Sequence, residues 1–222
     1  MTDAPFIAAG VAYYPEVDRA IAKYPYDPRA AEQLMGEAGL VKGSDGFFVS
    51  PADGPLHFEV KTLSASEREA EMAILGDTWR RAGFDFSEVV LPATQSSNNE
   101  ARNTFQSLFA YSTSSGEYTL ASLTSAAIGT PENRWIGANR GGWINPEFDR
   151  LAAAFAGAVS TPDRVGYIAE MARVFTTDVP SIPIQFDVRV HAFPSTLRGP
   201  QQAVEEASIP WNIHEWELAP SA

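Results

Sequence analysis

A strand, a helix and a second strand follow one another in the first half of the chain, and this unit constrains the fold most. Residues 56–60 alternate between apolar and polar side chains, as in a half-buried strand. Ser66, with Glu69 three residues later, predicts a helix start with a capping box, and Gly83 predicts the end of that helix. Residues 84–91 predict a second strand, so the unit indicates a parallel crossover connection.

The remaining pattern extends this alternation of helices and strands and predicts an α/β layer with a mixed sheet flanked by helices. Asp27, Asn145 and Thr161 each precede a proline, the combination of N-cap and first helical residue that starts a helix. The other expected elements are a helix over 27–38, a hairpin around 47–49, a short polar helix over 96–106, a strand over 108–112, helical residues within 117–128, helices from 145 and over 161–174, and a strand over 182–192.

Both ends of the chain look different from its middle. Residues 1–26 are rich in proline and tyrosine without a clean period, so we expect an extended N-terminal arm. Residues 194–222 are irregular and predict a C-terminal tail, which leaves 27–193 as the α/β lobe.

Charge and cysteine content exclude several classes of function. The formal net charge is −12, with an isoelectric point near 4.6, which argues against nonspecific nucleic-acid binding. The chain has no cysteine, so disulfides, thiolate metal sites and cysteine nucleophiles are excluded together. No apolar run is long enough for a membrane span, and the first residues do not resemble a secretory signal. We therefore expect any export signal to lie outside this chain.

The sequence contains no pattern that asks for catalysis, a cofactor or a metal. His57, His191 and His214 lack a second ligand-type residue at a convincing metal spacing, and His57 is expected to face solvent from its strand. No Gly-x-Ser-x-Gly elbow is present, and residues 137–142 lack the ending of a phosphate-binding loop. The expectation is a protein that is not an enzyme and that needs no cofactor.

A glycine-rich loop before the helix at Asn145 is the best candidate for a binding site. Asn139, Arg140 and Trp143 lie in this loop, and polar or aromatic side chains on loops held by a rigid scaffold are typical of binding sites. Residues 145–151 are interpreted as a helix start, with a capping asparagine, a proline and an acidic residue near the positive helix end.

Several motifs in order resemble one family, the peptide/nickel-type extracellular solute-binding proteins (family 5) of ABC importers. Residues 26–39, YDPRAAEQLMGEAG, resemble the element that opens the second lobe in that family. Residues 133–151, NRWIGANRGGWINPEFDRL, resemble its N-x-x-G-x-N-x-x-G-[YW]-x-NPE-[FY]-D-x-L string. The strand–helix–strand unit, the run VPSIPI at 179–184 and the end of the chain also match, so the resemblance covers about residues 20–218.

The resemblance adds candidate site residues on the strand over 108–112. Residues 105–114, FQSLFAYSTS, are similar to a family segment that delivers an aromatic ring and an acid to the ligand cleft. Tyr111 takes the place of the usual tryptophan, and Ser114 stands where peptide-binding members carry an aspartate for the ligand's ammonium group. This departure favours sugars, opines or peptides anchored elsewhere. The predicted ligand-binding residues are Tyr111, Ser112, Ser114, Asn139, Arg140 and Trp143.

The resemblance implies a periplasmic-binding-protein-like (type II) C-terminal lobe. It would bind a peptide or another small polar solute in a cleft shared with a missing N-terminal lobe, for delivery to an ABC permease in the membrane. It implies a periplasmic or extracellular location, with any membrane anchor outside this chain, and weak ligand binding by this chain alone. The alternative is a free-standing α/β interaction or regulatory domain that reuses the lobe without transport.

Overall fold

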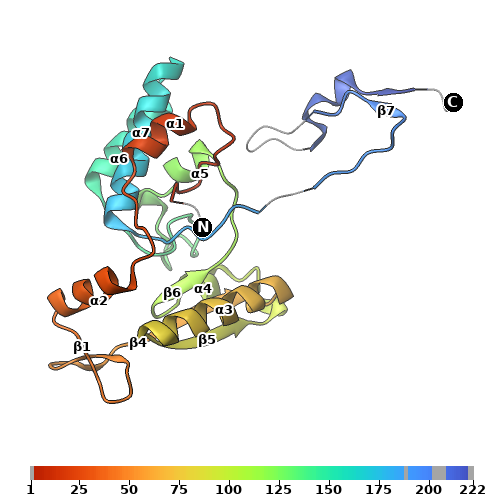
Figure 1. The fold of residues 1–222 in the computed structure, drawn as a ribbon. Helices are drawn as coiled ribbons and strands as arrows, with labels where there is room; N and C mark the ends of the chain where they lie inside the picture. Colours follow the sequence, from red (N-terminus) through yellow and green to blue (C-terminus); the bar gives the residue numbers. More distant parts are fainter. Residues whose placement is uncertain (1–2, 188–189, 202–208, 220–222) are drawn as a thin grey trace. The chain divides into compact units, whose positions relative to one another are not determined.

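The structure is a computed structural model that describes residues 3–187, 190–201 and 209–219 (Figure 1). The helices are α1 (Tyr14–Ala20), α2 (Pro28–Glu37), α3 (Ser66–Ala82), α4 (Asn99–Asn103), α5 (Glu117–Ala121), α6 (Pro146–Gly157) and α7 (Thr161–Asp178). The strands are β1 (Val41–Lys42), β2 (Phe48–Ser50), β3 (Gly54–Pro55), β4 (His57–Leu63), β5 (Asp85–Leu91), β6 (Leu108–Ala110), β7 (Leu197–Arg198) and β8 (Glu217–Leu218). Short 3-10 helices cover Ala93–Gln95, Ser125–Ala127 and Ile209–Glu215.

The described residues form two compact units, each built from segments that are distant in the sequence. The sheet unit consists of Tyr24–Thr113 and Ser125–Ile144. The helical unit consists of the described parts of Met1–Lys23, Ser114–Thr124 and Asn145–Ala222. The chain therefore leaves the sheet unit after β6, contributes α5 to the helical unit, and returns for one long loop.

The sheet unit is organised around three parallel strands in the order β5-β4-β6. β4 pairs with β5 along its whole length, from His57 opposite Asp85 to Leu63 opposite Leu91. The predicted strand–helix–strand unit is confirmed, since α3 connects β4 to the parallel β5. All three strands run in one direction, so their carboxyl ends lie at the same edge of the sheet.

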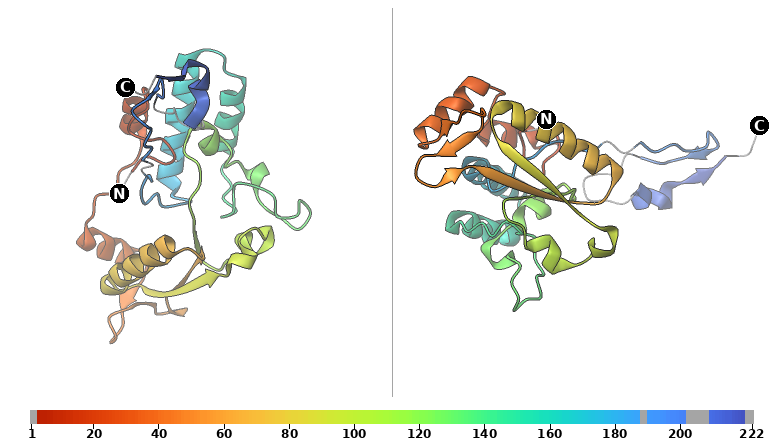
Figure 2. Two further views of the ribbon diagram at one scale, coloured as in Figure 1. Left: turned by 90° about the vertical axis from the view of Figure 1, so that its right-hand side faces the viewer. Right: turned by 90° about the horizontal axis from the view of Figure 1, so that it is seen from below.

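Helix α3 covers one face of this sheet, as Figure 2 shows. Val60, Met72 and Phe86 form the buried centre, and Trp79 packs edge-on against Phe86 with ring centroids 5.5 Å apart. Gly76 is required at the contact, because a Cβ there would lie 2.8 Å from the Phe86 ring. The predicted helix end at Gly83 is confirmed by its left-handed φ of 102°.

A second, small antiparallel sheet of β1, β2 and β3 confirms the predicted hairpin. The helix predicted over 27–38 is α2, and its cap is confirmed: Asp27 accepts bonds from the N–H groups of Arg29 and Ala30, each at 3.0 Å. The apolar stripe of this helix is not buried within the described residues, and the Leu34 side chain is 62% exposed.

The helical unit buries its apolar residues between α6 and α7, with α1 and α5 packed against α7. Phe148, Phe155, Ile168 and Met171 are among its fully buried side chains. Asn145 caps α6 as predicted, because its Oδ1 accepts a bond from Phe148 N–H at 3.0 Å. The cap predicted at Thr161 is wrong by one residue, because the Ser160 hydroxyl accepts the bond from Asp163 N–H at 3.2 Å and Thr161 begins the helix.

Three further expectations are corrected. Residues 1–26 are not an extended arm throughout, because Tyr14–Ala20 form α1, whose Val17 is fully buried in the helical unit. The capping box at Ser66 is wrong: Ala65 is the N-cap without a side-chain bond, and Ser64 Oγ donates to Glu69 instead, at 3.1 Å. The described residues of 182–192 form no strand, and proline in this segment removes donors that a ladder needs.

The predicted boundaries of a lobe over 27–193 and a tail over 194–222 stay predictions. The two compact units divide the chain differently, because α5, α6 and α7 bury their apolar faces together with α1, at the other end of the sequence. Sequence composition registers changes along the chain, whereas compactness depends on which segments pack together.

Candidate functional site

Tyr111 lies at the carboxyl edge of the parallel sheet, directly after the last residue of β6. Leu108 and Ala110 pack against the α3 side of the sheet. Phe109 and Tyr111 therefore project from the opposite face, because successive side chains of a strand alternate. In open α/β sheets ligands bind outside the carboxyl ends of the strands, so Tyr111 stands at a favourable position for binding.

An aromatic stack supports the Tyr111 ring. The rings of Phe109 and Tyr111 are 5.2 Å apart at 23°, and Phe105 continues the stack at 5.7 Å from Phe109 with the same angle. Stacked rings fix one another's orientation and offer a large, rigid contact area. Phe105 and Phe109 lie in the segment 105–114 that resembles the family's cleft segment, but the sequence predicts neither as a site residue.

Arg140 completes this arrangement from the other predicted site segment. Its guanidinium carbon lies 4.8 Å from the centroid of the Tyr111 ring, a cation–π contact. Arg140 belongs to the site loop, residues 125–144, which returns to the sheet unit after α5. The structure therefore brings together two predicted residues, Tyr111 and Arg140, from separate motifs.

Asn139 fastens the end of the site loop. Its side chain is buried, Nδ2 donates to the Trp143 carbonyl at 2.7 Å, and Oδ1 accepts a bond from Trp143 N–H at 3.1 Å. Its own N–H donates to the Ala127 carbonyl at 3.1 Å. Both ends of the Asn139 amide thus hold backbone, which positions the adjacent Arg140.

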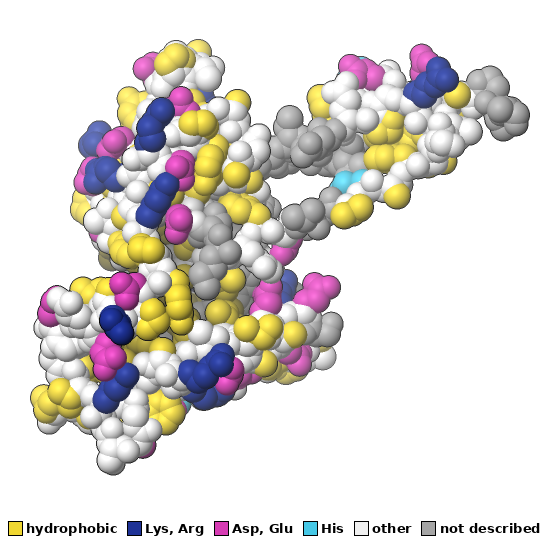
Figure 3. All heavy atoms as spheres, in the orientation of Figure 1, with side chains coloured by type: hydrophobic (Ala, Val, Ile, Leu, Met, Phe, Trp, Pro, Cys, Tyr) yellow, Lys and Arg dark blue, Asp and Glu magenta, His cyan; other side chains and the backbone are white. Residues whose placement is uncertain are grey.

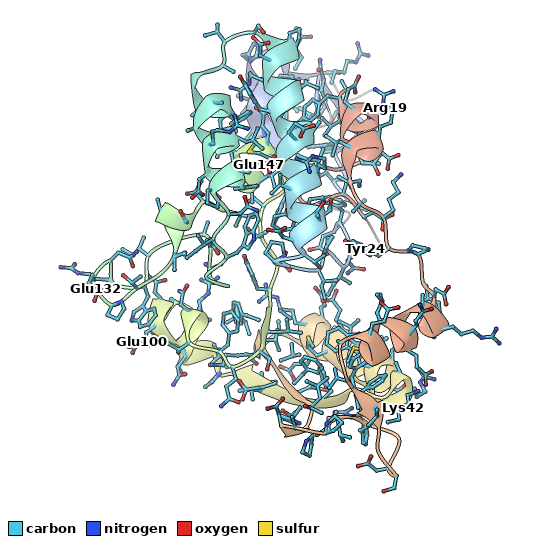
Figure 4. The ribbon with its side chains drawn as sticks, turned by 90° about the vertical axis from the view of Figure 1, so that its left-hand side faces the viewer. Arg19, Tyr24, Lys42, Glu100, Glu132 and Glu147 are labelled. Atoms are coloured by element: carbon cyan, nitrogen blue, oxygen red, sulfur yellow. The ribbon has the colours of Figure 1, made fainter. Side chains whose placement is uncertain are left out.

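Further polar contacts hold the middle of the site loop. Asn133 Oδ1 accepts a bond from Thr130 N–H at 2.8 Å, and Asn133 Nδ2 donates to the Ile128 carbonyl at 2.7 Å. Asn103 Nδ2 on α4 donates to the Trp135 carbonyl at 3.2 Å and links the loop to its neighbour. Figure 4 shows the loop beside α4, with the labelled Glu132 on the loop and Glu100 on α4.

Glycine is required where the site loop turns closest to itself. A Cβ at Gly137 would lie 2.0 Å from the carbonyl oxygen of Ala127, which no side chain tolerates. Arg134 and Trp135 adopt left-handed φ angles of 56° and 57°, which non-glycine residues rarely do. Such backbone persists only where surrounding contacts over-determine it, so the loop is a built structure rather than a loose connection.

Arg102 on α4 belongs to the same neighbourhood and was missed by sequence reasoning. Burial, and then the charge of Arg140, lowers the pKa of its guanidinium; the charge of Arg68 on α3 adds to this, and Tyr111 opposes it. Nothing in the spacing of the sequence relates Arg68, Arg102 and Arg140. The tertiary fold alone brings their charges within reach of one another.

The other predicted residues occupy different settings. Ser112 is an exposed residue of the sheet unit, and Ser114 is an exposed residue of the helical unit. Trp143 is half-buried at the end of the site loop, where its carbonyl accepts a bond from Asn139 Nδ2 and its N–H donates to Asn139 Oδ1. The structure therefore groups Asn139, Arg140 and Trp143 in one loop and joins Tyr111 to them through Arg140.

A serine, a histidine and an aspartate also meet on the sheet, away from the predicted residues. His57 Nδ1 lies 2.7 Å from Asp85 Oδ2, and His57 Nε2 lies 2.9 Å from Ser87 Oγ. The order of the three side chains matches a catalytic triad. The register of β4 and β5 explains this order, since Asp85 lies opposite His57 and Ser87 is the next residue of β5 on the same face. The side chains of His57 and Asp85 are 47% and 44% exposed, which is unlike the water-excluding setting of a hydrolase.

Two properties of the described residues bear on other kinds of site. Across 3–187, 190–201 and 209–219, no three histidine, aspartate or glutamate side chains are grouped so that they could hold a metal ion. Within the same ranges, no helix combines the length and the apolar character that crossing a membrane requires.

Comparison with known proteins gives matches to solved structures, whereas no family model and no curated protein sequence matches. NikZ from Campylobacter jejuni in complex with Ni(L-His) matches 88% of this chain with a TM-score of 0.65 at 21% identity. The oligopeptide binding protein from Thermus thermophilus with a pentapeptide matches 80% of this chain, with a TM-score of 0.61 at 22% identity. The periplasmic EDTA-binding protein EppA matches 99% of this chain, with a TM-score of 0.69 at 14% identity.

These proteins are solute-binding proteins of the peptide/nickel type, so the predicted fold class is confirmed. The α/β fold of this chain is the periplasmic-binding-protein-like fold. This chain spans 40%, 31% and 40% of the three solved structures, respectively.

Proposed function

We propose that this chain is one ligand-binding lobe of a solute-binding protein that serves an ABC importer. The observation that carries the proposal is the Tyr111–Arg140 contact at the carboxyl edge of a sheet whose fold matches that class. An aromatic ring and a guanidinium on a rigid scaffold provide contact area and polar recognition without the acid–base groups that chemistry requires. The proposed protein is accordingly a carrier and not an enzyme.

The ligand has to be inferred from side chains, since solved structures with this fold bind different solutes. NikZ is in complex with Ni(L-His), the Thermus thermophilus protein holds a pentapeptide, and EppA is described as EDTA-binding. Ser114, in place of the aspartate of peptide-binding members, offers no charge for a peptide ammonium group. We therefore propose a small polar solute, bound near Tyr111, Ser112, Asn139, Arg140 and Trp143.

This chain spans only 31–40% of the three solved structures that it matches, which supports a second lobe outside this chain. Solute-binding proteins of this kind close two lobes over a ligand, and the ligand stabilises the closed state by its differential affinity. We propose that the matching lobe supplies the other half of the binding surface, and that the closed protein docks on a membrane permease in the periplasm or outside the cell. The lobe alone should then bind solute weakly.

The test is a binding measurement on the intact chain with paired tyrosine variants. A panel of oligosaccharides, short peptides, carboxylic acids and metal chelates is screened by isothermal titration calorimetry at millimolar solute concentration. Tyr111→Ala should weaken the binding of a hit by about tenfold or more, the scale of a lost aromatic contact. Tyr26→Ala, also in the sheet unit and with an 82% exposed side chain, should leave binding unchanged. Equal binding by both variants would remove the site from consideration.

A further inference from the structure

The positive charges of Arg68 and Arg140 both act on Arg102 within the sheet unit, although the chain carries a net charge of −12. Arg68, Arg102 and Arg140 make no ion pair within the described residues, whose salt bridges involve other cations. On the face that Figure 3 shows, lysine and arginine side chains are interspersed with acidic ones. A cluster of unpaired guanidiniums in so acidic a chain therefore needs an explanation.

Two arginines of the helical unit show what a carboxylate partner does to a guanidinium group in this chain. Arg173 is bonded to Glu147 at 2.8 Å and to Glu170 at 2.9 Å, and these bonds raise its pKa. Arg164 is paired with Glu117, and that bond raises its pKa. For Arg102 the direction is reversed, because burial and the charge of Arg140 lower its pKa.

Buried donors in this cluster are left without acceptors. The Nε atoms of Arg102 and Arg140 are buried and make no hydrogen bond within the described residues. Buried polar groups are nearly always hydrogen-bonded, and each exception calls for a ligand, an ion or a strained state as its cause. Two such exceptions on electrostatically coupled arginines indicate a position prepared for an acceptor.

Contacts of neighbouring residues position the two arginine-bearing segments. Arg140 is stacked on Tyr111 at the carboxyl edge of the sheet, and the Asn139 bonds to Trp143 fasten the loop next to it. Arg102 lies on α4, and Asn103 beside it bonds the same loop through the Trp135 carbonyl. Arg140 is thus held by its ring contact, and the backbone that carries Arg102 is held by the bond of Asn103, which lowers the entropic cost of binding.

We infer that Arg102 and Arg140, flanked by Tyr111, form a subsite for an oxyanion group of the solute, a carboxylate or a phosphate. The guanidinium fork donates parallel bonds to either group, and its charge persists at every physiological pH. Arg68 adds positive potential, and the Tyr111–Phe109 stack contacts the adjoining part of the solute. The inference rests on the proposed function and narrows its ligand to anionic small molecules.

The experiment titrates the intact chain with citrate, inorganic phosphate and neutral maltotriose at fixed ionic strength, followed by calorimetry. Citrate or phosphate should bind, and Arg102→Gln and Arg140→Gln should each weaken that binding by about tenfold or more. Arg29→Gln removes the same charge from an exposed position of the sheet unit and should change nothing. A stronger response to citrate assigns a carboxylate, and a stronger response to phosphate assigns a phosphate group.

A second readout needs no variant that could fail to fold. In the wild-type chain, the arginine Nε–Hε signals of Arg102 and Arg140 should shift in 15N–1H NMR spectra on addition of the binding anion, while that of Arg29 stays in place. No anion binding, or anion binding that leaves both signals and both variants unaffected, would overturn the inference. In that case, binding of a neutral solute that is weakened by Tyr111→Ala would still support the proposed function. If anions bind at the arginines but Tyr111→Ala weakens the binding of no solute, only the proposed function would be contradicted.

Discussion

The guanidinium of Arg140 lies 4.8 Å from the ring centroid of Tyr111, and this contact joins the site loop to the carboxyl edge of the sheet. The two residues come from motifs on either side of a segment that belongs to the helical unit. Their contact combines a rigid aromatic surface with a donor-rich cation. It is the relationship on which the proposed binding function depends.

Asn139→Ala should weaken both the stability of the sheet unit and solute binding. The substitution leaves the Trp143 N–H and carbonyl without their side-chain partners, at a cost of about 1–3 kcal/mol of unfolding free energy. Urea denaturation followed by circular dichroism measures this loss. Gln33→Ala removes an amide from exposed α2, and a loss of similar size there would refute the role assigned to Asn139.

Gly137→Ala and Gly166→Ala should change stability in opposite directions. A Cβ at position 137 would meet the Ala127 carbonyl at 2.0 Å, so the site loop must shift at a cost of about 1–3 kcal/mol. Gly166 lies within α7, where a Cβ has no heavy atom within 4 Å, so alanine should stabilise the chain by about 0.5–1 kcal/mol. Thermal denaturation of both variants compares them, and two changes of the same sign would contradict the loop geometry.

Glu132 should contribute a stabilising effect that disappears at acidic pH. Its own backbone N–H and the Thr130 hydroxyl donate to its carboxylate and hold its pKa below the ordinary value of 4.5. Because the folded-state pKa is the lower one, this contribution is present above pH 4.5 and is lost as the pH falls through the folded value. Carboxyl NMR titration measures the pKa, and urea denaturation from pH 6 to pH 3 compares the chain with Glu132→Gln. If the difference between the two chains stays constant with pH, the assignment is wrong.

Ser87 should not behave as a nucleophile despite its bond to His57. The side chains that would activate it are nearly half exposed and arise from strand register, without a water-excluding site. A fluorophosphonate probe should therefore leave the chain unlabelled under conditions that label a serine hydrolase completely. Labelling that disappears in Ser87→Ala would reopen the question of an enzyme.

Much of the fold could be predicted because local rules decided it. Asp27 and Asn145 cap their helices as expected, and Gly83 ends α3 in a left-handed conformation, since caps depend on neighbouring backbone. The misplaced cap at Thr161 and the missed helix α1 mark the limit of such rules. Adjacent hydroxyls at Ser160 and Thr161 compete for one role, and α1 is stabilised by burial against the distant α7.

The site was only partly predictable for a related reason. Tyr111, Asn139 and Arg140 lie in recognisable motifs, but nothing in those motifs tells which of the three side chains faces a ligand and which holds backbone. Arg102 gave no signal at all, because its pKa and its lack of a hydrogen-bond acceptor at Nε depend on the charges and burial around it. A contact between segments that are far apart in the sequence produces no periodic pattern in the local sequence, so it cannot be predicted from such a pattern.

The sequence by itself determined several helix ends, the parallel strand–helix–strand unit and the α/β class, because hydrophobic period, capping and turn preferences act over a few residues. Only the tertiary structure decided that the chain forms two units from interleaved segments and that Arg102 and Arg140 are electrostatically coupled beside Tyr111. Burial and charge coupling act through space. Their effects appear once packing has brought distant residues together.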